Sequence, residues 1–278
     1  MDSADEVVIE LEASQTSMAA GVGRVVSAGE RGKALLDRRV LVGPIDPCGE
    51  CDVCRRGGAA VCPQAVRREQ LAATATAAAR WLVALGDGLE LPLPAAAAVA
   101  GDVALAYTLY ARTGVGPRDP VVVVGGSPVT RFLVEILLAK GVSPSAVAAP
   151  GPWADWLAGK GVAVVPDRAS LIAVLAAQSL GTRPWRVICG DGSHAAAAEL
   201  AGPRATLTLL ASPATSPIAS DVLAREVTII GVAGAHPDLV VEAAAMCVRG
   251  DIDLAGGVTD LPTESLRTHV RAWDVSRR

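Results

Sequence analysis

The sequence predicts an α/β protein in two parts: an opening part of short strands, and a longer part that forms a doubly wound parallel sheet. Three observations predict this. Short apolar runs near the start are separated by glycine or charged turns, four cysteines stand close together after them, and strand and helix patterns alternate from about residue 94 onward. Such alternation places helices on both faces of a parallel sheet.

The composition indicates a folded chain with a substantial core. Hydrophobic residues make up 51% and charged residues 19% of the 278 residues, which excludes a disordered chain. A net charge of −4, with 5 Trp, 2 Tyr and 1 Phe, offers little for phosphate attraction or base stacking, so we expect no nucleic-acid partner. The start is acidic, and Gly101 and Asp102 interrupt the apolar stretch 91–110. We therefore expect no membrane span, no export and a cytoplasmic location.

The opening part is mostly β. Residues 7–12, 23–27 and 39–42 have the apolar patterns of short strands. The segment 71–85 stays undecided, because its alanines favour a helix while its threonines and valine tolerate a strand. From Asp251 the chain returns to short strand-like pieces.

Four cysteines form the most specific motif of the chain. They follow the spacing C-x2-C-x2-C-x7-C, with glycines that relieve the tight turns: Cys48, Cys51, Cys54 and Cys62. Four thiolates satisfy a tetrahedral zinc ion with no vacant position, so the predicted zinc is structural and not catalytic. An iron–sulfur cluster and metal-free cysteines are the alternatives. Cys189 and Cys247 lie in apolar surroundings and are expected to be buried core thiols.

The second part begins with a helix and then a strand, a glycine turn and another helix. The helix covers about 94–112, the strand 121–124, the turn Gly125-Gly126-Ser127-Pro128, and the next helix ends near Lys140. The alternation continues with strands at 146–149 and 162–165, helices at 153–160 and 169–178, and apolar runs at 187–189, 206–210 and 227–232.

At this point the sequence resembles the zinc-containing branch of the medium-chain dehydrogenase/reductase superfamily, typified by alcohol dehydrogenases. The cysteine motif within 39–57, Gly23-Arg24-Val25-Val26 and Cys62-Pro63 carry the resemblance, and weaker likeness covers nearly the whole chain. The resemblance implies a GroES-like β domain with a zinc lobe over 1–93, completed by about 251–278. It also implies a Rossmann-like nucleotide-binding domain over 94–250.

Family members that oxidise alcohols hold a second, catalytic zinc, for which this chain lacks ligands. No cysteine precedes Cys48 and no histidine precedes His194, and residues 18–23 stand in place of the Gly-His-Glu motif. Only Asp102 falls where the third ligand is expected, and we interpret it as solvated or capping. The histidines His194, His236 and His269 have no partner at metal spacing and are expected at the surface or in local hydrogen bonds.

The dinucleotide motif Gly-x-Gly-x-x-Gly is incomplete. Gly125, Ser127 and Thr130 stand at its three glycine positions, with Gly126 and Val129 as the other cofactor-binding candidates. Ser127 adds a side chain where the diphosphate should lie, and β-branched Thr130 should push the helix away from the sheet. Residues 148–151 offer neither the acidic group nor the arginine that normally contacts the adenosine ribose. NAD or NADP binding is therefore doubtful.

Three functions remain open. The first is a degenerate member without dehydrogenase activity that serves as a binding or partner subunit. The second is a zinc-independent NAD(P)-dependent oxidoreductase acting on an enone, enoyl-CoA or hydroxyacyl substrate, with Tyr107 and Thr108 as proton donors or oxyanion stabilisers near Asp102. The third is a non-redox lyase, isomerase or cyclase using an interdomain cleft for a small molecule.

The resemblance also implies how subunits pair. Family members pair through the last strand of the nucleotide domain, here residues 227–232 followed by Gly234. We expect a homodimer, and a hetero-oligomer with an active paralogue is the alternative.

Overall fold

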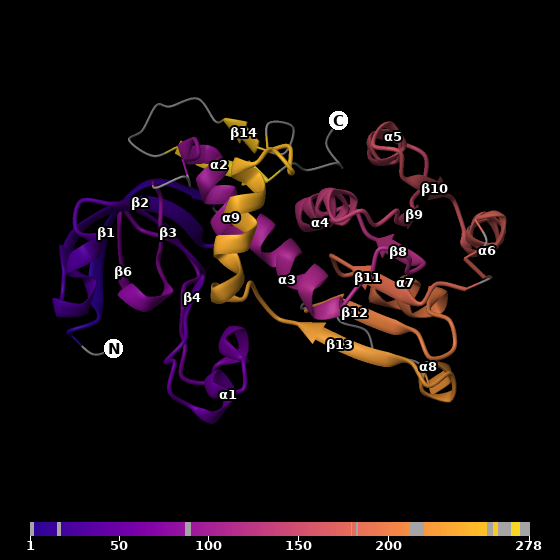
Figure 1. The fold of residues 1–278 in the computed structure, drawn as a ribbon, viewed down its shortest axis with the longest axis horizontal. Helices are drawn as coiled ribbons and strands as arrows, with labels where there is room; N and C mark the ends of the chain where they lie inside the picture. Colours follow the sequence, from indigo (N-terminus) through magenta and orange to yellow (C-terminus); the bar gives the residue numbers. More distant parts are fainter. Residues whose placement is uncertain are drawn as a thin grey trace. The chain divides into compact units, whose positions relative to one another are not determined.

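The computed structural model describes residues 3–15, 18–86, 90–178, 180–181, 183–211, 220–254, 258–260 and 268–272. The chain divides into two compact units, one of Met1–Leu105 with Gly234–Trp273 and one of Ala106–Ala233 with Asp274–Arg278. Figure 1 shows their elements as a ribbon. The expected domain boundaries, at about residues 93 and 250, differ from the unit boundaries, which follow Leu105 and Ala233. The assignment of domains stays a prediction.

The first unit is built on a seven-stranded sheet in the order β14-β15-β1-β2-β3-β7, with β6 paired to β1. β1 runs antiparallel to β2 and β6 and parallel to β15. The bounds are β1 Glu6–Gln15, β2 Ala20–Ala28, β3 Arg39–Val42, β6 Thr74–Ala78, β7 Val83–Ala84, β14 Val258–Asp260 and β15 Thr268–Ala272. The expected β character of this part is thus confirmed, and β1 is longer than the predicted strand 7–12.

Alternate side chains of β1 enter the core of the first unit. Val7 and Ile9 are buried, and they pack in one cluster with Val25, Val40 and Ala77 from the neighbouring strands. Register shifts in the β1–β2 pairing come at Val8/Ile9 and at Leu11/Ala13, yet alternation continues to the strand's end, where Gln15 is buried. A polar side chain therefore enters the apolar side of the sheet.

The segment left undecided at 71–85 is mainly extended. β6 is followed by a short 3₁₀ turn, η3 (Ala79–Trp81), and by β7. Alanine alternates with threonine in β6, and Ala75 and Ala77 are buried while Thr74 and Thr76 are exposed. Pairing with β1 therefore overrides the helix preference of alanine.

A continuous helix runs through Gly101 and Asp102, so these residues do not end it. It consists of α2 (Leu93–Ala98), a π-helical turn η4 (Val99–Val103) and α3 (Ala104–Thr113). By length and composition this helix could cross a membrane, but 83% of its most apolar window is buried inside the fold, so its length and composition are weak evidence for a span. Within the first unit, α9 (Val240–Val248) packs beside η4.

The second unit contains a six-stranded parallel sheet in the order β10-β9-β8-β11-β12-β13. The bounds are β8 Val121–Val124, β9 Ser145–Val147, β10 Ala163–Val165, β11 Arg186–Cys189, β12 Thr206–Leu210 and β13 Thr228–Val232. Strand order reverses beside β8, which is the arrangement of doubly wound nucleotide-binding folds. Every residue of β8 is buried, as expected for a central strand covered on both faces.

Five helices of the second unit connect these strands among the described residues. They are α4 Pro128–Ala139, α5 Pro152–Gly159, α6 Arg168–Ala177, α7 His194–Leu200 and α8 Ser220–Ala224. The first three match the predicted helices to within about two residues. α7 and α8 were not predicted, because seven and five residues give too little periodicity to recognise.

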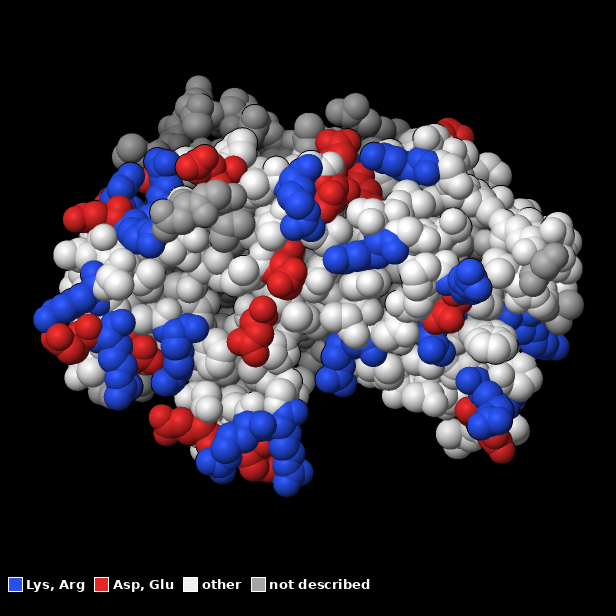
Figure 2. All heavy atoms as spheres, viewed as in Figure 1, with Lys and Arg blue, Asp and Glu red and all other residues white. Residues whose placement is uncertain are grey.

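Charged side chains are mixed on the surface. On the face drawn in Figure 2, basic and acidic groups are interspersed. Some are paired, such as Arg39 with Glu12 at 2.6 Å and Lys33 with Glu30 at 2.5 Å.

Candidate functional site

The four predicted zinc ligands come from a loop between β4 (Ile45–Asp46) and β5 (Val66–Arg67), which pair with each other. Cys51 caps the single helical turn α1 (Asp52–Arg55), which carries Cys54, and Cys62 follows the 3₁₀ turn η2 (Ala59–Val61). Gly49 and Gly57 have φ of 77° and 79°, the left-handed conformation in which a side chain is strained. The loop therefore turns back on itself twice and brings its cysteines together.

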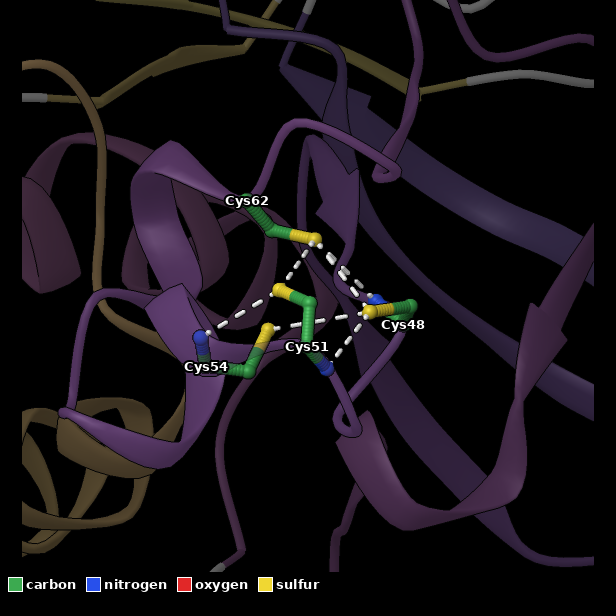
Figure 3. Close-up of side chains that lie close together, drawn as sticks. All are labelled: Cys48, Cys51, Cys54 and Cys62. Carbon is green, nitrogen blue, oxygen red and sulfur yellow. Dashed lines mark hydrogen bonds between the residues drawn. The ribbon is translucent and has the colours of Figure 1, made fainter.

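The sulfur atoms lie as a tetrahedral ion requires. Sγ–Sγ distances are 3.6 Å for Cys48–Cys62, 3.8 Å for Cys51–Cys62 and 4.0 Å for Cys48–Cys54, and all four sulfurs lie within 4.8 Å of one another (Figure 3). Zinc–sulfur bonds of about 2.3 Å at tetrahedral angles place sulfurs about 3.8 Å apart. The residues present therefore fit zinc.

Backbone amides point at the same sulfurs. The amides of Cys51 and Cys54 donate to the Sγ atoms of Cys48 and Cys51, both at 3.4 Å, and the amide of Cys48 donates to Cys62 Sγ at 3.5 Å. Hydrogen bonds from the amides of Glu50 and Cys51 lower the pKa of Cys48 to about 6, whereas burial raises the pKa of Cys54 to about 12. A bound cation would favour the thiolate at every ligand.

The four-cysteine lobe is the loop 47–65 between β4 and β5. Arg80 and Trp81 fix it to the sheet of the first unit. Arg80 donates to the carbonyl of Cys48 at 2.9 Å and pairs with Asp5 at 3.1 Å, and Trp81 Nε1 donates to the carbonyl of Pro47 at 2.7 Å. His236 Nε2 lies 2.8 Å from the carbonyl of Gly57, and its Nδ1 lies 3.5 Å from Asp238. This histidine thus supports the lobe and is not a ligand.

Asp102 is not solvated, and that expectation is wrong. It lies in the π-helical turn η4, is 3% exposed, and its Oδ2 accepts a hydrogen bond from Gln15 Nε2. The Asp102 amide donates back to Gln15 Oε1 at 3.3 Å. A Cβ added at Gly101 would lie 2.0 Å from the same Oε1, so Gln15 fills the space above this turn. Burial raises the pKa of Asp102 to about 6, and the hydrogen bond from Gln15 partly offsets this.

The other weak catalytic candidates are also buried. Tyr107 and Thr108 lie in the part of α3 that belongs to the second unit. The Tyr107 ring stands beside Tyr110 at 5.7 Å between centroids, and Lys140 Nζ lies 5.8 Å from its centroid. Their roles as proton donors stay predictions.

The glycine turn follows β8 and leads into α4. Gly125 has a φ of 105°, and Ser127 caps α4 by accepting a hydrogen bond from the amide of Thr130 at 3.2 Å. Ser127 Oγ also donates to the carbonyl of Gly190 at 2.7 Å, and the amide of Gly126 donates to Asp191 Oδ2 at 3.0 Å. Val129 is buried in the first turn of the helix. Gly190 and Asp191 come from the loop after β11, so this turn contacts two residues that the sequence reasoning missed.

Thr130 does not hold α4 away from the sheet. A Cβ added at Gly190 would lie 2.5 Å from Thr130 Oγ1 and 3.2 Å from Thr130 Cα, so the helix comes close to the end of β11. The glycine that allows close packing stands on the strand side here, at position 190.

The two remaining cysteines and His194 belong to the core. Cys189 and Cys247 are buried, as predicted, and burial raises the pKa of Cys189 to about 12. His194 is buried, and its Nε2 lies 2.7 Å from the carbonyl of Leu210. The side chain of His269 lies outside the described residues. Among the residues that the structure describes, the four cysteines are the only group of three or more metal-ligating side chains close enough to share an ion.

No family model and no curated protein matches the sequence. Solved structures do match. An alcohol dehydrogenase from Thermus sp. ATN1 has a TM-score of 0.76 and 16% identity over 93% of this chain and 86% of that one. The D-arabinose dehydrogenase from Sulfolobus solfataricus has a TM-score of 0.77 and 16% identity over 96% and 93%. A short chain alcohol dehydrogenase from E. coli CFT073, complexed with NADH, has a TM-score of 0.74 and 16% identity over 91% and 83%. The chain has the fold of the medium-chain alcohol dehydrogenases.

The medium-chain dehydrogenase fold gives the four-cysteine lobe and the glycine turn their context. In a doubly wound sheet the turn after the first strand, here β8, is where a dinucleotide's diphosphate lies against backbone amides and a helix N-terminus. The residues at this turn do not fit a diphosphate, because the Asp191 carboxylate already accepts the Gly126 amide and Ser127 already accepts the Thr130 amide. The cysteine lobe, in contrast, fits its ion.

Proposed function

We propose that this chain is a zinc-containing, alcohol dehydrogenase-like protein with a structural zinc and no catalytic zinc, which acts as a binding or partner subunit. One observation carries the proposal. Asp102, the one acidic side chain at the expected place of a catalytic ligand, is buried and its carboxylate is bound by the amide of Gln15.

The chemistry of the donor set supports this reading. A catalytic zinc needs three protein ligands and one open position, commonly from histidine, cysteine and carboxylate groups. Around Asp102 the partner is a neutral amide, and within the described part of the chain no group of three metal-ligating residues forms apart from the four cysteines. A lone carboxylate does not hold zinc.

The structural zinc has a separate role. Four thiolates leave no coordination position for substrate, so when bound the ion cross-links the loop between β4 and β5 and stabilises it. The chain's own contribution is to orient the ligands, through the amides of Cys51 and Cys54 and through Arg80 and Trp81. These contacts hold the lobe against the sheet of the first unit.

Metal analysis together with turnover tests the proposal. We expect one zinc per chain in the wild type and in the Gln15→Ala and Asp102→Asn variants, and no zinc-dependent oxidation of alcohols. A second zinc that disappears in Asp102→Asn would contradict the proposal. Reproducible turnover of NADH or NADPH with an enone, enoyl-CoA or hydroxyacyl substrate would instead favour the zinc-independent oxidoreductase.

The partner is proposed to be a second copy of the chain, paired through β13. Among the strands that the structure describes, β13 is the last in the order of the six-stranded sheet and pairs with β12 alone. A hetero-oligomer with an active paralogue is the alternative, and the two are distinguished by the mass of the purified chain in solution.

A further inference from the structure

Two loops meet at the carboxyl end of the six-stranded sheet in the second unit. β8 and β11 are parallel neighbours, with Val124 paired to Cys189 at their ends. Gly125-Gly126 follow β8 in the sequence, and Gly190-Asp191 follow β11. The glycine turn and Asp191 are therefore adjacent because of strand order, although 65 residues separate Gly126 from Asp191 in sequence.

The Asp191 carboxylate lies directly on the glycine turn. Its Oδ2 accepts the Gly126 amide at 3.0 Å, and its Oδ1 accepts the Ser193 amide at 2.9 Å. A Cβ added at Gly125 would lie 2.3 Å from Oδ2 and 2.5 Å from the carboxyl carbon. The space that a glycine opens for a ligand at this turn is thus filled by a side chain of the same protein.

The backbone amides in the first turn of α4 are also partly bound by groups of the same chain. Pro128 has no amide hydrogen, and the Thr130 amide is bound by Ser127 Oγ at 3.2 Å. Ser127 is held in turn by the carbonyl of Gly190 at 2.7 Å. The amides of Gly126 and Thr130 are therefore already bound within the chain, and Pro128 has no amide hydrogen to offer an anion.

We propose that Asp191 serves as an internal anion for the glycine turn and is the residue that excludes a dinucleotide's diphosphate from it. The inference deepens the proposed function and rests on it. A diphosphate binds such a turn because backbone amides and the helix N-terminus favour negative charge. Here a carboxylate provides that negative charge, so an entering phosphate meets both an occupied donor and a like charge.

Two variants separate the space that Asp191 fills from the charge that it carries. Asp191→Asn keeps the size but removes the charge, and with only one carbonyl oxygen it cannot accept both amides equally well. Asp191→Ala removes the charge and empties the space. Asp167→Asn is the matched control: it removes one negative charge in the same unit, and asparagine replaces aspartate as the cap of α6 at little cost.

The experiment is titration of the zinc-loaded full chain with ADP, NADH and inorganic pyrophosphate, by calorimetry and by tryptophan fluorescence. Trp153 provides the optical signal, because a Cβ added at Gly126 would lie 3.5 Å from its ring. We expect ADP affinity to rise in the order wild type, Asp191→Asn, Asp191→Ala, with a gain of about tenfold or more for the last. The Asp167→Asn chain should bind like the wild type. Thermal melts establish that each variant folds, and Asp191→Asn carries the test if Asp191→Ala does not fold.

The outcomes for the inference and for the proposed function differ. If the folded Asp191 variants bind ADP no better than the wild type, the inference is overturned, while weak NADH binding by the wild type leaves the proposed function standing. If the wild type binds NADH with micromolar affinity, the proposed function loses its support. The inference falls with it in that case, because a wild type that binds NADH this tightly does not exclude the diphosphate from the glycine turn.

Discussion

Asp102 carries a charge that its surroundings disfavour. It lies in a π-helical turn inside a long helix, and turns of this kind are frequent at functional sites. Its carboxylate accepts a hydrogen bond from the side-chain amide of Gln15, and the residue is almost fully buried. The raised pKa is the consequence, since burial penalises the ionised carboxylate more than one hydrogen bond stabilises it.

The buried Asp102, bound by Gln15, predicts that the stability of the chain depends on pH. In the folded chain Asp102 keeps its proton up to pH about 6, whereas in the unfolded chain it releases it near 3.8. Between these values the folded state binds more protons, so the free energy of unfolding falls as pH rises, by at most about 3 kcal/mol. We expect Asp102→Asn to gain stability relative to the wild type over this window and to keep a constant difference above it, as measured by urea unfolding at successive pH values.

Asp167→Asn is the control for that series. Hydrogen bonding to Ser170 lowers the pKa of Asp167, so its contribution is present above the unfolded pKa and is lost only as pH falls through the folded pKa. The difference between Asp167→Asn and the wild type should therefore stay flat from about pH 5 to 6. A flat difference for Asp102→Asn in the same window would contradict an ionisable Asp102 buried in the native state.

At the scale of elements, the four-cysteine lobe depends on its ion more than on its own packing. α1 has four residues, none of them buried, and η2 has three, so neither element is stable by itself. Hydrogen bonds from Arg80 and Trp81 reach only the first residues of the lobe, at Pro47 and Cys48. Beyond them, His236 hydrogen-bonds the carbonyl of Gly57, and the sulfurs hold the remainder of the loop.

Replacing one ligand should therefore release the ion and unfold the lobe. We expect Cys54→Ser to lose its zinc, with an affinity loss larger than the roughly 10- to 100-fold that follows loss of an outer-shell partner. Limited proteolysis should then cut within the lobe while the six-stranded sheet stays protected. Cys247→Ser is the matched control, because Cys247 is a buried thiol on α9 outside the metal group. Retention of stoichiometric zinc by Cys54→Ser would show that sulfur geometry does not hold the ion.

Elements with local signals could be predicted from the sequence, and those with distant causes could not. The cysteine spacing, the β8–turn–α4 unit and helices α5 and α6 each follow from residues within about twenty positions. The extended form of β6 depends on pairing with β1, far away in sequence. The Gln15–Asp102 contact spans 87 positions and the Gly126–Asp191 contact 65, so neither has a local signal. The second could have been inferred from strand order, which brings the ends of the first and fourth parallel strands together.

At the scale of the whole molecule, the edges of the two sheets decide what the chain can pair with. Unpaired edges invite pairing with another chain, and natural proteins usually cover or interrupt them. β13 combines half-buried Ile229 and Ile230 with exposed Thr228 and Gly231. An apolar edge strand without charged residues at its centre is suited to continue the sheet across a two-fold axis.

Pairing through β13 predicts a particle of about twice the chain mass of 28.2 kDa in light scattering after size exclusion. Ile230→Lys places a charge on the strand, and burying it unpaired in a dimer costs enough to weaken association by about tenfold or more. We therefore expect this variant to run as a monomer at micromolar concentration with its thermal melt little changed. Leu223→Lys is the control, since Leu223 is 70% exposed on α8 and lies outside β13. A folded Ile230→Lys chain that stays dimeric would place the interface elsewhere, and a monomeric wild type would favour a different chain as the partner.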